Sequence, residues 1–103
     1  MTRREVLAWL DARRPAPPPA LRVHLDAAVT DSDEWLPAHL AELGHAMLAR
    51  VTARPEGGRE LALDLLAADA FVTYAFEAQA EADVRGVAAL ADRVAATGQG
   101  GGT

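Results

Sequence analysis

The stretch LALDLLAADAFVTYAFEAQAE, residues 61–81, decides the fold. It is rich in Ala and Leu, which lose little conformational freedom in a helix and therefore favour one. Read at about 100° per residue, its apolar side chains fall on two opposite sides of that helix. The primary side holds Leu61, Leu65, Ala68, Val72, Ala75 and Phe76, and the second side holds Leu63, Leu66, Ala70 and Tyr74.

A helix that is apolar on two faces is covered on two faces. We expect the primary side to pack on the rest of the chain. The short Ala-rich segment after residue 82 is too small to cover the second side alone. The pattern therefore predicts a homodimer, the commonest kind of oligomer, with an interface formed by Leu63, Leu66, Ala70 and Tyr74.

The N-terminal third reads as two helices joined by a stiff connector. Thr2 and Glu5 have the spacing of a capping box, which begins a helix that we expect to run to about residue 14. The run PAPPP at residues 15–19 then ends it, because proline lacks a backbone donor and restricts the residue before it. A second helix is predicted to begin near Pro19, since proline suits a first helical turn.

The remainder reads as a helix hairpin and a further helix. Pro37 fits only in a first turn, so the third helix is predicted to begin between residues 34 and 36 and to stop before Pro55. The short loop at 56–58 makes the third helix and the helix over 59–81 antiparallel neighbours. Asp83 is then expected to cap a fifth helix.

The sequence thus predicts an all-α fold, a four- to five-helix bundle with a central long antiparallel helix hairpin. Residues 1–97 form a single helical domain in this reading, which suits the length of the chain. Residues 98–103 read as a flexible Gly-rich tail.

Composition narrows the function classes. There are no cysteines, which excludes disulfides, thiolate metal sites and cysteine nucleophiles. The net charge is −5, and an acidic chain argues against nucleic-acid binding, which needs a basic face. No run approaches the ~18 apolar residues of a membrane span, and the N-terminus has no signal-peptide pattern, so we expect no membrane contact and a cytoplasmic protein.

One pattern suggests a metal. His39, Glu42 and His45 follow each other at spacings of three and contain the Glu-x-x-His element of di-metal helical bundles. The three side chains drift around the helix, however, and only His39 borders the expected core. A solvated polar face is therefore the favoured interpretation, and no cofactor is predicted.

Asp69 is the one acid near the middle of the 61–81 helix. Two interpretations are open. In the first, Asp69 lies at the edge of the core, with its carboxylate in water or paired with an arginine. In the second, it lines a cavity. No nucleophile and base pair is visible, which favours a non-enzymatic dimerisation or adaptor module. The alternative is a bundle that binds a metal or small apolar ligand, with candidate ligand-binding residues Trp35, His39, Asp69, Phe71 and Phe76.

Overall fold

The computed structural model describes the backbone of residues 1–54 and 57–101, and their side chains as far as residue 96. Within these ranges every regular element is helical, so the prediction of an all-α fold is confirmed. The elements in chain order are α1 (Arg3–Asp11), α2 (Pro19–Ala28), α3 (Leu36–Thr52) and α4 (Arg59–Gly101).

The helix starts follow the local sequence signals. The Glu5 amide donates to the Thr2 hydroxyl at 3.2 Å, and the Thr2 amide donates to the Glu5 carboxylate at 2.9 Å, which completes the capping box. Pro19 and Pro37 each lie in the first turn of a helix, as predicted. The first helix ends at Asp11, three residues earlier than expected.

The predicted break at Asp83 is wrong. α4 continues without interruption from Arg59 to Gly101, 43 residues and about 64 Å at the usual rise. Asp83 accepts a hydrogen bond at 2.9 Å from the side-chain amide of Gln79, one turn earlier, and caps nothing. The helix also enters the segment expected to be a tail, where residues 102 and 103 lie outside the described part.

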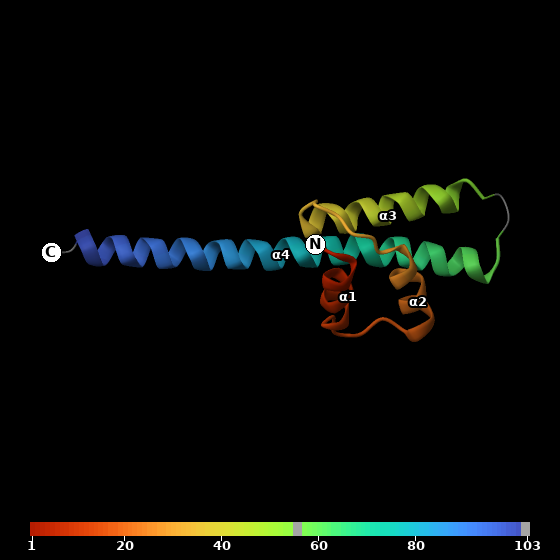
Figure 1. The fold of residues 1–103 in the computed structure, drawn as a ribbon, viewed down its shortest axis with the longest axis horizontal. Coiled ribbons are helices and arrows are strands. Elements are labelled where there is room, and N and C mark those ends of the chain that lie inside the picture. Colours follow the sequence, from red (N-terminus) through yellow and green to blue (C-terminus); the bar gives the residue numbers. More distant parts are fainter. Residues whose placement is uncertain (55–56, 102–103) are drawn as a thin grey trace.

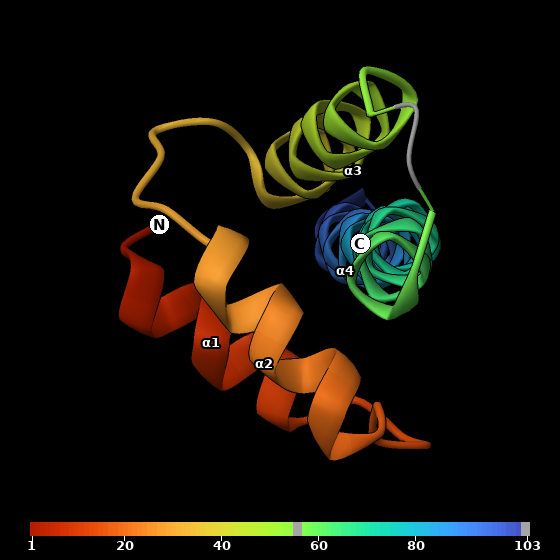
Figure 2. The ribbon, with the colours of Figure 1, turned by 90° about the vertical axis from the view of Figure 1, so that its right-hand side faces the viewer.

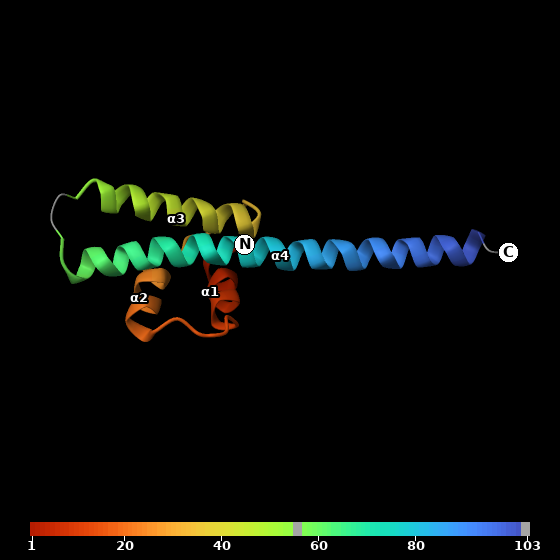
Figure 3. The ribbon, with the colours of Figure 1, turned by 180° about the vertical axis from the view of Figure 1, so that it is seen from behind.

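The shorter helices all gather on one half of α4. Figure 1 shows α3 alongside the N-terminal part of α4, running in the opposite direction, with α1 and α2 on another side. The view from behind in Figure 3 shows the same separation. The C-terminal part of α4 projects beyond them, so the molecule measures 70 × 24 × 21 Å.

The core lies where the first half of α4 meets the other helices. Its largest fully buried side chains come from all four helices: Phe71, Leu10, Leu25, Leu40 and Val6. Burial of each such side chain stabilises the fold by about 1.5–3 kcal/mol relative to exposure. Viewed along the long axis in Figure 2, α3 and the α1–α2 pair flank α4 on two sides and leave its remaining side open.

A polar cluster fastens α1 to α4. The Arg13 guanidinium lies 3.7 Å from the centre of the Trp9 ring and donates to Glu81 at 2.6 Å. Trp9 Nε1 also donates to Glu81, at 3.1 Å, and its ring meets Tyr74 edge-on with centroids 6.0 Å apart. The hydrogen bond from Arg13 is the main reason that the pKa of Glu81 is lowered. These contacts hold Tyr74 against α1.

This fastening corrects the predicted orientation of α4. Its buried face is centred on Phe71, about a quarter turn from the predicted primary side. Ala68 and Ala75 are buried as expected, but three other members of that side are exposed: Leu65, Val72 and Phe76. The buried face thus lies between the two apolar sides of the sequence pattern and includes members of both, Ala68 and Ala75 from the primary side and Tyr74 from the second.

Gly44 brings α3 and α4 into close contact. A Cβ atom at this position would lie 3.0 Å from the carbonyl oxygen of Ala68 and 2.9 Å from a methyl group of Val72. The carbonyl belongs to the α4 backbone and cannot turn away, so the helices would have to separate. Glycine is therefore required for the observed spacing.

We expect Gly44→Ala to lower the free energy of unfolding by about 1–2 kcal/mol, because overpacking outweighs the gain of about 1 kcal/mol in helix propensity. Urea unfolding followed by circular dichroism at fixed protein concentration measures the change. Gly86→Ala is the matched control, since a Cβ there meets open space and should raise stability. A rise in stability for both variants would contradict the close packing at Gly44.

Candidate functional site

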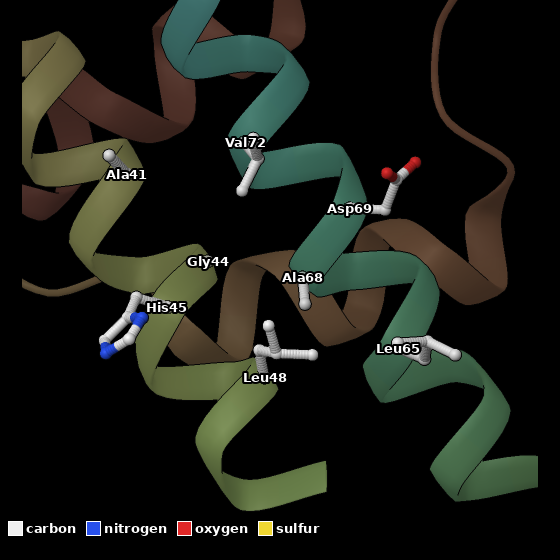
Figure 4. A pocket seen from close by; sticks show the side chains of 8 residues that line it. All are labelled: Ala41, Gly44, His45, Leu48, Leu65, Ala68, Asp69 and Val72. Atoms are coloured by element: carbon white, nitrogen blue, oxygen red, sulfur yellow. The ribbon is translucent and has the colours of Figure 1, made fainter. Parts of the chain in front are cut away.

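An apolar groove runs between α3 and α4 on the side away from α1 and α2. It consists of two adjoining hollows of about 430 Å³ and 290 Å³, which share Ala41 and Val72 in their walls. Figure 4 shows the larger hollow, with Leu48, Ala68 and Val72 extending into the space between the helices. The smaller hollow extends the groove towards Trp35 and Phe76.

An exposed apolar stripe on α4 begins in this groove and continues along the projecting part of the helix. Its members are between 42 % and 73 % exposed and fall within a sector of about 60° at the usual helical rotation. We call this stripe the α4 seam: Leu65, Val72, Phe76, Val87, Leu90 and Val94. All described side chains from residue 83 to residue 96 are exposed, so no part of the chain that the structure describes covers the second half of the seam.

The four residues predicted to form an interface lie in different environments. Tyr74 is buried against Trp9, and burial raises the pKa of its hydroxyl. Leu63 and Ala70 are half-buried, while Leu66 is 53 % exposed. Much of the predicted second side is therefore covered by α1 and α2, and the larger exposed apolar surface is the α4 seam.

The five predicted ligand-binding residues divide between the groove and the core. Trp35 and Phe76 are exposed and line the same hollow. Phe71 and His39 are buried in the interior, where they contribute to packing. Asp69 lies at the rim of the larger hollow, and the structure thus brings together only part of the predicted set.

Asp69 is an exposed acid and not a buried one. Figure 4 shows its carboxylate turned away from α3, on the outer side of α4. Arg50 and His24 line a different hollow, together with Asp64. Of the two interpretations, the one with the acid head in water matches the exposure of Asp69.

The structure separates the three residues of the suggested metal site. His39 is buried and its Nε2 donates to the Thr30 carbonyl at 3.1 Å, while Glu42 and His45 are exposed. Among the residues that the structure describes, no group of three or more His, Asp or Glu side chains is placed to share a metal ion. Residues that are three apart in the sequence do not return to the same angle on a helix. Each successive side chain therefore lies further around the helix, which explains the separation.

The second half of the seam falls in the separate helix that the sequence predicts after Asp83, so the sequence analysis does not predict the seam as one stripe. A signal for it exists in the sequence. Val87, Leu90 and Val94 continue the angular position of Leu65 and Phe76 if the helix is not interrupted at Asp83. A single helix through residue 83 places all six residues in one stripe.

A charged cluster fastens α2 to the start of α4. The His24 ring lies with Nδ1 3.2 Å from the Ala20 carbonyl and Nε2 2.9 Å from the Glu60 carboxylate. Asp64 lies 3.9 Å from Nε2 and also pairs with Arg54. Two oxygen acceptors favour the doubly protonated ring, and the hydrogen bond to Glu60 is the leading cause of the raised pKa of His24.

Comparisons with known proteins add no assignment. No protein-family model matches the chain, and neither curated proteins nor solved structures gave a significant match. No helix in the described ranges has the length and apolar character needed to span a membrane. The groove and the seam must therefore be interpreted from their own chemistry.

The pKa of His24 predicts a pH dependence of stability. Because the folded-state pKa is raised, this contact stabilises the fold fully below the unfolded value of about 6.5 and loses its effect as the pH rises through the folded value. In an NMR titration, Glu60→Gln should lower the pKa of His24 clearly, and Asp64→Asn should lower it less. Equal pKa values in the parent and Glu60→Gln proteins would contradict the assignment.

Proposed function

We propose that the chain is a non-enzymatic interaction module whose function is to form a homodimer through the α4 seam. The observation that supports this most directly is the seam itself. It exposes six large apolar side chains in one narrow sector, three of them on a projecting helix that no described part of the chain covers. Contiguous apolar patches of this kind mark interaction sites on soluble proteins.

The exposed area suits a stable interface. With Trp35 and Leu48, which flank the groove, the seam exposes on the order of 800 Å² per chain, about the share that one partner contributes to a standard interface. Removing that surface from water supplies a favourable free energy, part of which offsets the cost of association. A second copy of the chain carries the same surface and can cover it symmetrically.

The polar groups around the groove favour a helix over a small ligand as its occupant. Small-molecule pockets combine an apolar wall with a few polar groups that converge on the ligand. Here the side chains of Asp69 and His45 both turn away from the space between the helices (Figure 4). A partner helix needs apolar contact along the groove and few polar contacts, because its backbone hydrogen bonds are already satisfied.

Light scattering should give twice the 10.9 kDa chain mass at micromolar concentration. Leu90→Glu should weaken the dimer about 30-fold or more, because it places an uncompensated charge in the apolar contact. Since Leu90 is exposed and lies outside the core, the part formed by α1, α2, α3 and the first half of α4 should stay folded in the monomer and keep its helical circular dichroism.

Ala95→Glu is the matched control, because Ala95 lies on the same projecting segment but well away from the seam. It should leave the dimer essentially unchanged. A monomeric parent protein, or equal loss of association in both variants, would be evidence against dimerisation through the seam.

A further inference from the structure

We infer that the two copies pair antiparallel along α4, so that the projecting half of each chain occupies the α3–α4 groove of the other. This inference rests on the proposed dimer and specifies its geometry. Each groove is then completed by Val87, Leu90 and Val94 of the second copy, and neither chain forms the full site alone.

The spacing of the seam supports this geometry. Leu65 and Val94 lie equally far from the midpoint between Gln79 and Ala80, and so do Val72 and Val87. An antiparallel pair of identical helices centred on that midpoint therefore places Leu65 opposite Val94 and Val72 opposite Val87. Both halves of the seam keep the same angular position on the helix, so one straight contact serves both ends.

The lengths of the helices also fit. α3 has 17 residues, about 26 Å, and the groove follows it along the first half of α4. The part of α4 from residue 83 to Gly101 has a similar length, about 28 Å. When the midpoints coincide, this segment of one copy lies opposite residues 58–76 of the other and covers all of the α4 residues that line the groove except Gln79.

The acids beside the seam distinguish antiparallel from parallel pairing. Asp69 and Asp83 lie at the same angular position as the seam residues. In a parallel dimer each would lie beside its own copy, which brings like charges together across the contact. In the antiparallel dimer Asp69 faces Leu90 and Asp83 faces Phe76, so the like charges are kept apart. Repulsion of this kind selects orientation in paired helices.

The lack of native cysteine allows a direct test by disulfide trapping. Val72→Cys and Val87→Cys proteins are purified separately, then mixed to exchange subunits and oxidised with diamide, which takes up the two protons and two electrons that the thiols release. Thiols that face each other within a dimer have an effective concentration of about 1 mM, whereas thiols on separate dimers meet only at the micromolar protein concentration. The mixture should therefore give about a hundredfold more covalent dimer than either variant alone.

The outcomes separate the inference from the proposed function. Rapid crosslinking of Val87→Cys alone would indicate parallel pairing, and a parent dimer that traps no disulfide in any combination would place its interface elsewhere. The first result overturns the antiparallel geometry and leaves dimerisation through the seam standing, whereas the second overturns both. A parent protein that is monomeric by light scattering overturns both.

A spin label gives an independent measurement that leaves the seam intact. Ala95→Cys carries the label on an exposed position away from the seam. In the antiparallel dimer the two labels lie about 45 Å apart along the helix axis, because each is far from the midpoint. In a parallel dimer they lie within about 25 Å, the width of two helices. A short distance in a dimer of unchanged mass would overturn the inference.

Discussion

The structure depends on a mismatch of length between α4 and the helices that cover it. α4 has 43 residues, whereas α3 has 17 and α1 and α2 have 9 and 10. Three short helices can bury only the first half of so long a helix, and the apolar pattern does not stop where they stop. The exposed seam is the direct consequence, since the chain has no described element left to cover it.

The contact at Gly44 determines the form of the groove. α3 approaches the α4 backbone closely there, beside the buried Phe71 and Ala68, and Val72 lies partly exposed at the outer edge of this contact. On the opposite flank the contact of Trp9 with Tyr74 holds α1 against α4. Two sides of α4 are therefore fixed by its own chain, and the third side, adjacent to α3, is the one that remains for a partner.

Local signals in the sequence were sufficient for the helix starts and for the fold class. The Thr2–Glu5 capping box, Pro19 and Pro37 each act through their own backbone, so their effect can be read without knowing the rest of the molecule. The orientation of α4 could not be read in this way. It depends on contacts between distant parts of the chain, such as those of Arg13 and Trp9 with Glu81 about 70 residues away. The length of α4 could not be read either, because Asp83 is an acid equally suited to a cap or to an exposed helical position. The same ambiguity at Asp83 divides the seam between two expected helices.

The projecting half of α4 links helix formation to association. It contains Gly86, and its described side chains make no core contacts, so packing contributes little to its helical state in a single chain. Helices of this length are marginal in water without an apolar face to bury. A partner that binds only the helical form must stabilise it by its own binding free energy. In the proposed dimer, burial of Val87, Leu90 and Val94 therefore both joins the two chains and stabilises the helix that carries these residues.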